Sequence, residues 1–177
     1  MNLTYFPIIV SIFAIIYVFF LIKKIRKSPV AGGKAVAITQ AVQEGAMSFL
    51  KRQYKTVSMV AVVLFFVLLV FMGWKIGVGF LIGATLSGIS GFIGMLVSTQ
   101  TNTRVAEAAK KGLVQALDLS FKGGLVTGLL VVSLGLLAVS GYYFLTGIEG
   151  LIALGFGASL ISVFARVGGG IYTKAAD

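Results

Sequence analysis

The feature that most constrains the fold is a set of five apolar stretches, each close to the length that crosses a lipid bilayer. These stretches cover residues 3–22, 57–74, 76–99, 123–144 and 151–172. A helix needs about 20 apolar residues to cross a hydrocarbon core of about 30 Å. Because backbone polar groups must be paired within lipid and barrels show short alternating strands, these stretches are predicted to be helices. The predicted fold class is an all-α, polytopic transmembrane helix bundle.

Composition excludes several other classes of protein. Hydrophobic residues make up 58% of the chain and charged residues only 11%, and the mean hydropathy is +1.04. A soluble domain carries about twice that charged fraction. The net charge of +10 could suggest nucleic acid, but no basic and aromatic surface stands apart from the apolar stretches, so no nucleic-acid partner is predicted. The chain has no cysteine and no histidine, so a metal would need oxygen ligands, which favours Mg²⁺ or Ca²⁺.

The distribution of lysine and arginine predicts the orientation in the membrane. If the N-terminus lies outside, all of the 15 Lys and Arg residues except Lys75 fall on or toward the cytoplasmic side. Cytoplasmic segments of membrane proteins are enriched in these residues. We therefore expect the N-terminus outside and Asp177 inside, in a multi-pass protein of the cell inner membrane or of an acidic compartment.

The second apolar stretch is predicted to belong to a much longer helix. Residues 35–74 contain no proline, and Gly45 is the only glycine before Gly73. At 1.5 Å per residue such a helix would be about 60 Å long, roughly twice the bilayer core. Residues 35–55 would then extend into the cytoplasm. The alternative is an amphipathic surface helix at 35–55, followed by a separate span.

Small residues recur on one side of the third and fourth stretches, among the 23 glycines of the chain. The residues concerned are Ser87, Gly91, Gly94 and Ser98 in the third stretch, and Gly123, Gly124, Gly128 and Gly135 in the fourth. Small residues allow membrane helices to approach closely, so a tight bundle is expected.

The last apolar stretch carries polar side chains along one face. At about 100° per residue, Ser162, Arg166, Thr173 and Asp177 all lie within about 60° of Ser159, and Lys174 borders the same face. An ionisable residue inside a membrane span is a candidate functional residue. The stripe therefore predicts a polar pathway below a cytoplasmic anion site.

Two plainer interpretations of this helix stay open. Arg166 could pair with a buried acid and join two helices, because a buried arginine needs a partner. The three glycines at 168–170 are only a weak phosphate signal, since they form neither a Walker A loop nor a dinucleotide fingerprint.

Five motifs together resemble the membrane-bound, ion-translocating inorganic pyrophosphatases. The most specific is the final run, FARVGGGIYTKAAD at 164–177, in which Tyr172 stands where phenylalanine is also common. The others are EGAMSFLKRQYKT at 44–56, SGFIGM at 90–95, NTRVA at 102–106 and FKGG at 121–124. The resemblance covers essentially the whole chain in order.

The resemblance implies that residues 1–177 are the N-terminal part of one transmembrane domain. The family's fold has about sixteen helices, of which these would be the first five, with the N-terminus outside and a homodimeric assembly. The chain stops abruptly on Asp177, which also suggests a fragment. The implied function is hydrolysis of inorganic pyrophosphate coupled to pumping of H⁺ or Na⁺ across the lipid bilayer.

The same resemblance assigns roles to four residues. Lys174 matches a lysine that contacts pyrophosphate, and Asp177 matches the first aspartate of the Mg²⁺-pyrophosphate site. Arg166 matches an arginine of the ion-coupling region, and Ser159 a small polar residue along the same pathway. The carboxylates that would activate the attacking water have no counterpart here, so no catalytic residue is expected in these 177 residues, and the fragment alone is expected to be inactive.

One alternative from another class remains at this point. The chain could be a non-enzymatic, glycine-rich segment of a carrier or channel in which Arg166 lines a pore. Whether H⁺ or Na⁺ is pumped, and whether K⁺ is required, depends in this family on later helices.

Overall fold

A computed structural model describes the backbone of residues 5–30, 32 and 34–176. It describes the side chains of the same residues except 34, 35, 166 and 168–176. The described residues form five helices, namely α1 (Tyr5–Arg26), α2 (Lys34–Met72), α3 (Trp74–Ala109), α4 (Leu113–Thr146) and α5 (Ile148–Ala176). All five are long and apolar enough to cross a membrane. The predicted all-α bundle is therefore confirmed.

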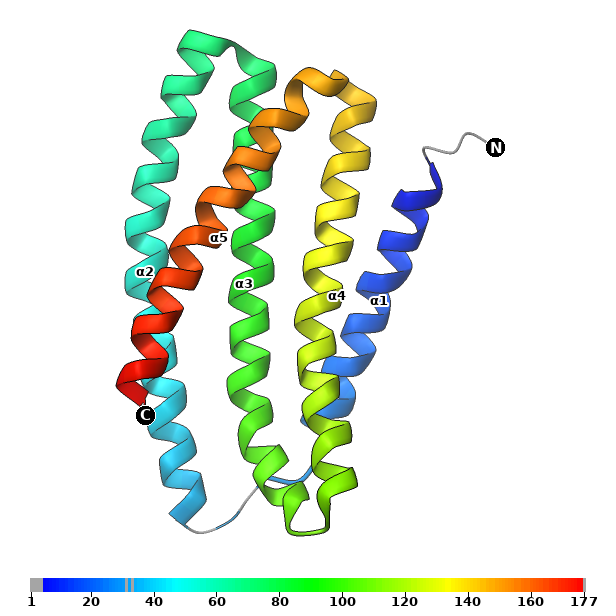
Figure 1. Ribbon diagram of the computed structural model, residues 1–177, viewed down its shortest axis with the longest axis vertical. Coiled ribbons are helices and arrows are strands. Elements are labelled where there is room, and N and C mark those ends of the chain that lie inside the picture. The colour runs from blue at the N-terminus through cyan, green and yellow to red at the C-terminus, as the bar shows by residue number, and fades with distance from the viewer. Residues whose placement is uncertain (1–4, 31, 33, 177) are drawn as a thin grey trace.

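Four helices stand side by side, and the fifth crosses them (Figure 1). Helix α3 lies between α2 and α4, and α1 packs on the far side of α4. Helix α5 starts beside α4, crosses α3 diagonally and ends beside α2. Helix α1 is thus next to α4 in space, although it precedes α2 in the chain.

Single glycines make the tight reversals at one end of the bundle. Gly73 joins α2 to α3 with a φ of 89°, and Gly147 joins α4 to α5 with a φ of 69°. Left-handed backbone of this kind strains every residue with a Cβ, so glycine suits both positions. The turn at Gly73 also ends α2 at Met72, two residues before the predicted end of that span, and places Trp74 in α3.

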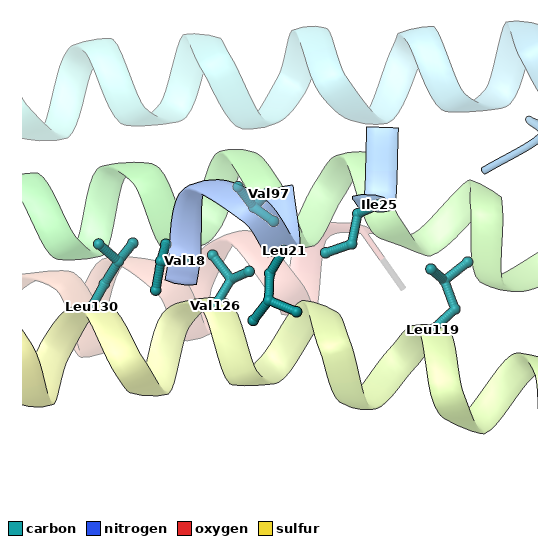
Figure 2. Packing of buried hydrophobic residues seen from close by; sticks show 7 residues of the cluster. All are labelled: Val18, Leu21, Ile25, Val97, Leu119, Val126 and Leu130. Carbon is teal, nitrogen blue, oxygen red and sulfur yellow. The ribbon is translucent and has the colours of Figure 1, made fainter. Parts of the chain in front are cut away.

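The largest apolar cluster lies between α1, α3 and α4 (Figure 2). Its buried members are Val18, Leu21 and Ile25 of α1, Val97 of α3, and Leu119, Val126 and Leu130 of α4. Two smaller clusters lie where α3 meets α2, α4 and α5. The side chains on the outer faces are also apolar and exposed, including Phe13 and Phe20 of α1. Apolar surface on both sides of a helix is expected where lipid is the solvent.

Helix α2 runs without a break over 39 residues. The predicted extension at 35–55 and the second span therefore belong to one helix, and the alternative of a separate surface helix is wrong. Helices α2 and α4 both begin at the same end of the bundle, where α1 ends (Figure 1). Lys27 and Lys110 are consequently at one end and Lys75 at the other, which agrees with the grouping of charges predicted for the two sides of the membrane.

The small residues of α3 pack closely, but against three different helices. The Ser87 hydroxyl donates a hydrogen bond to α5. Gly91 lies against the Tyr54 hydroxyl of α2, and Gly94 lies against the Thr127 side chain of α4. In α4 only Gly123, which faces Thr101, is at a close approach. The other three predicted glycines are on the opposite side of α4 from Val126 and Leu130. A Cβ added at Gly124, Gly128 or Gly135 would have no neighbouring atom within 4 Å. The close packing predicted for those three is absent among the described residues.

Candidate functional site

Helix α5 is the element that carries the predicted site residues. Its backbone is helical from Ile148 to Ala176, so Ser159, Arg166 and Lys174 all lie on one continuous helix. Ser159 is exposed. The side chains of Arg166 and Lys174 are not among those described, and Asp177 lies outside the described residues. The structure therefore gives the position of the α5 backbone but not that of the predicted ligand-binding side chains at its end.

Two glycines bring α5 into direct backbone contact with α3. A Cβ on Gly83 would collide with the carbonyl group of Leu154, and a Cβ on Gly157 would collide with the carbonyl group of Phe80. Such contacts need residues without side chains, as in other close crossings of membrane helices. This pair of glycines allows the backbones of α3 and α5 to approach closely where the helices cross.

Hydrogen bonds from α3 and α2 add to this contact. The Ser87 hydroxyl donates to the carbonyl oxygen of Ala158 at 3.0 Å, one residue before Ser159. On α2, the Gln53 side-chain amide donates to the carbonyl oxygen of Phe164, two residues before Arg166. Helix α5 is therefore anchored directly beside two of the predicted pathway positions.

Tyr54 connects α2 to α3 next to the same crossing. Its hydroxyl donates to the carbonyl oxygen of Gly88 at 2.9 Å. Its ring meets that of Phe92 edge to face, with centroids 5.7 Å apart. Sequence reasoning singled out the motif at 44–56 but gave Gln53 and Tyr54 no role. Their place in that motif was the only sequence signal for a role, and the fold shows that Tyr54 contacts α3 and Gln53 contacts α5.

The opposite end of the crossing is also cross-linked. The Tyr142 hydroxyl donates to the carbonyl oxygen of Lys75 at 2.5 Å, and the Lys75 ammonium pairs with the Glu149 carboxylate at 3.2 Å. The Glu149 side chain is largely exposed and that of Lys75 about half exposed, so the pair contributes little stability by itself. Together the two contacts join the α2–α3 turn to the start of α5.

Two hollows lie between the helices, and the larger one borders the crossing. The larger, about 650 Å³, lies between α2, α3 and α5 and has mainly apolar walls that include Val57, Leu81 and Ile161. A polyanion would not be stable there, because a buried charge needs charged or polar partners. The second, about 480 Å³, lies between α3 and α4 and includes the polar side chains of Ser98, Thr101, Asn102 and Ser120.

The motif at 102–106 lies near the end of α3, and the guanidinium of Arg104 within it has only some of its hydrogen-bond donors paired. One of its terminal nitrogens, Nη1, donates to the carbonyl oxygen of Gln100 at 2.6 Å. Its Nε is buried and has no hydrogen-bond partner in the part of the chain that the structure describes. A buried donor without a partner is unusual in folded proteins.

The described side chains do not assemble a metal site. No group of three or more carboxylates lies close enough among them to bind a metal ion. Mg²⁺ surrounded by so few protein oxygens would rely on water and substrate ligands. The only carboxylate for which a metal role is predicted, Asp177, lies outside the described residues.

The helices and their apolar surfaces define an integral, multi-pass membrane protein. The chain belongs to the inorganic H⁺ pyrophosphatase family, because residues 12–177 match the family model described as "Inorganic H+ pyrophosphatase". The resemblance inferred from the motifs is thereby confirmed.

Relatives with assigned names agree with this membership. A protein of Methanosarcina mazei named K(+)-insensitive pyrophosphate-energized proton pump is 46% identical over 161 residues, which are 89% of this chain and 24% of the relative. K(+)-insensitive pyrophosphate-energized proton pump 2 of Moorella thermoacetica is 38% identical, over 97% of this chain and 27% of the relative. A Clostridium tetani protein with the provisional name K(+)-stimulated pyrophosphate-energized sodium pump is 39% identical, over 97% of this chain and 26% of the relative.

The chain thus spans about a quarter of the length of the relatives it matches. Two of these relatives, 46% and 38% identical, are named as proton pumps, and one, 39% identical, is named as a sodium pump. Identity over these residues therefore does not assign the transported ion.

Proposed function

We propose that the complete protein containing this chain hydrolyses inorganic pyrophosphate and uses the free energy to pump H⁺ or Na⁺ across a membrane. The observation that carries the proposal is the family match over residues 12–177, which includes the motif at 164–177. The names of the relatives support the same coupling of pyrophosphate to ion transport. A carrier or channel segment without enzymatic activity is disfavoured, because each of these relatives is named as an energised pump.

Lys174 is the proposed substrate-binding residue of this segment. Pyrophosphate is a compact polyanion, and a lysine ammonium provides a point charge that suits a phosphate oxygen. In the complete protein Asp177 would contribute one oxygen to bound Mg²⁺, together with carboxylates from elsewhere in that protein. Bound Mg²⁺ would neutralise charge on the substrate and on the leaving phosphate. Whether K⁺ is also needed is not decided by these residues.

Arg166 and Ser159 are the proposed pathway residues. Arg166 precedes Lys174 by eight residues of α5, which is about 12 Å along the helix. At that separation Arg166 does not reach the phosphate that Lys174 binds. Its proposed role is therefore in ion coupling, on a helix whose position is set by Gly83, Gly157 and Gln53.

The proposed arrangement in the membrane follows the charges and the family resemblance. The N-terminus lies outside, the end of α5 faces the cytoplasm, and two copies of the complete protein form a homodimer. Residues 1–177 form the N-terminal part of one transmembrane domain within each copy.

Reconstitution of the complete protein tests the proposed function. The protein is placed in sealed vesicles, and phosphate release is measured beside uptake of H⁺ or of labelled Na⁺ after addition of pyrophosphate and Mg²⁺. We expect hydrolysis together with uptake of one of the two ions, and loss of uptake when an ionophore collapses the gradient. Hydrolysis without transport of either ion, or no hydrolysis at all, would contradict the proposal.

A further inference from the structure

Helix α1 has one face that packs into the bundle and an opposite face that is exposed. Val18, Leu21 and Ile25 are buried against α3 and α4 (Figure 2). On the opposite side of α1, Ile16, Phe20 and Lys23 lie on one helix face. Lys27 lies in the turn just after α1 ends at Arg26, and it continues the same spacing of three or four residues. Ile16 and Phe20 are 46% and 66% exposed, and both lysines are exposed too. The outward stripe is thus apolar first and cationic at its end.

The length of α1 places this cationic end at the level of lipid headgroups. Its 22 residues make a helix of about 33 Å, close to the bilayer core of about 30 Å. Helix α3 has 36 residues, about 54 Å, and the α3–α4 turn extends well past the end of α1 (Figure 1). Lys110 and Lys111 of that turn therefore lie at the same end of the bundle but farther from the core.

The cations at the end of α1 have no counter-ion in the described part of the chain. They are Lys23, Lys24 and Arg26 in the last turn of α1 and Lys27 directly after it, and α1 itself contains no acidic residue. Among the described carboxylates, Glu107 of α3 is paired with Lys110 at 2.7 Å and Asp118 of α4 with Lys122, and Glu44 of α2 forms no ion pair with the end of α1. Four unpaired cations at headgroup level create a local field that attracts anions.

We propose that Lys23 and Lys27 bind the phosphate of an anionic phospholipid whose acyl chain lies along Phe20 and Ile16. Lys27 follows Lys23 by four residues at the end of α1, about 6 Å at the rise of a helix, so both ammonium groups can reach one phosphate. Lys24 and Arg26 flank the pair and add to the attraction. A purely topological role would require only positive charge on this side of the membrane. The lipid site requires in addition that two of the cations continue an exposed apolar stripe.

A comparison of two charge-matched variants tests the lipid site. Lys23→Gln with Lys27→Gln removes two cations from the stripe, and Lys110→Gln with Lys111→Gln removes two from the same end of the bundle but outside it. The complete protein is purified in neutral detergent with phosphatidylglycerol or phosphatidylcholine, and bound lipid is counted by native mass spectrometry. We expect the wild type and the turn variant to retain phosphatidylglycerol preferentially. The stripe variant should lose affinity for it by roughly fivefold for each lysine.

Several outcomes would overturn the proposal. They are equal lipid retention by the stripe variant and the wild type, equal losses in both variants, and displacement of the lipid by millimolar inorganic phosphate. If the double stripe variant does not insert into the membrane, Lys27→Gln and Lys27→Arg replace it. Only the glutamine variant should then lose phosphatidylglycerol, and equal behaviour of the two would contradict the site.

Discussion

Gly83 and Gly157 illustrate how single residues decide the geometry around the proposed ion pathway. Each meets a carbonyl group of the facing helix where a Cβ would have to lie. By contrast, Gly155 of the same helix α5 has no neighbour within 4 Å of that position. Two glycines only two residues apart therefore have different structural roles.

We predict that Gly157→Ala destabilises the 177-residue chain and that Gly155→Ala does not. The methyl group at 157 would push α5 away from Phe80, and overpacking of this kind costs about 1–3 kcal/mol. At 155 the same change meets open space, and replacing a helical glycine by alanine should stabilise the helix by up to about 1 kcal/mol. Thermal unfolding of both variants in detergent, followed by circular dichroism, measures the difference. Equal unfolding temperatures would contradict the close crossing of α3 and α5.

We predict that Lys174→Ala and Arg166→Ala fail differently in the complete protein. Loss of the lysine charge should raise KM for pyrophosphate by about tenfold or more, because a charge-assisted contact to substrate is removed. Loss of the arginine, about 12 Å away along α5, should impair ion transport, and hydrolysis with it if the two are tightly coupled. Steady-state hydrolysis measured beside ion uptake in sealed vesicles separates the two effects.

Unchanged pumping per pyrophosphate in the Arg166→Ala protein would assign that residue to a structural ion pair. The interpretation of the α5 face as a pathway would then be wrong. Lys174→Arg is a useful control, because it keeps the charge and alters only its geometry.

At the scale of elements, α5 is oriented by the helices that it crosses. Helix α3 contributes the glycine contact and the Ser87 hydrogen bond, and α2 contributes the Gln53 amide. The motif at 44–56 thus acts on α5 through a contact across 111 residues of sequence. Gln53 lies at the middle of the unbroken helix α2, where it is level with Phe164 of α5.

We predict that the two ends of the bundle face opposite sides of the membrane, with Lys75 outside and Lys34 inside. The 177 residues contain no cysteine, so single cysteines can be introduced here and any others in the complete protein replaced. Lys75→Cys should react with an impermeant maleimide in intact cells, and Lys34→Cys only after permeabilisation. Labelling of Lys34→Cys in intact cells would contradict the predicted orientation.

At the scale of the whole molecule, the described helices do not assemble a metal site by themselves. The described residues bring no cluster of carboxylates together, and the chain spans about a quarter of its relatives' length. We therefore predict that the 177-residue chain alone releases no phosphate from pyrophosphate, because Mg²⁺ bound to a polyanion needs more oxygen ligands than Asp177 provides. A phosphate-release assay with the purified chain and Mg²⁺ tests this, and the complete protein serves as the positive control. Mg²⁺-dependent release by the chain alone would contradict the prediction.

Much of the fold was predictable because it depends on local properties. In lipid every backbone polar group must be paired within its own segment, so length and apolarity suffice to predict the five helices. The same reasoning predicted that residues 35–55 continue into the second span, since no helix breaker separates them. The family was predictable from the motif at 164–177 and its companions, and the roles of Ser159, Arg166, Lys174 and Asp177 stay predictions.

Only the tertiary structure decided which helices touch. A soluble helix shows its buried side as an apolar stripe, but here lipid-facing and protein-facing sides are both apolar, so no such pattern exists. The pairing of α1 with α4, the crossing of α5 over α3 and the reach of Gln53 to Phe164 therefore had no sequence signal of their own. Small residues indicated close contacts, yet Gly83 and Gly157 make them while Gly128 and Gly135 do not. Shape complementarity between helices distinguishes these cases, and it exists only once the helices are packed.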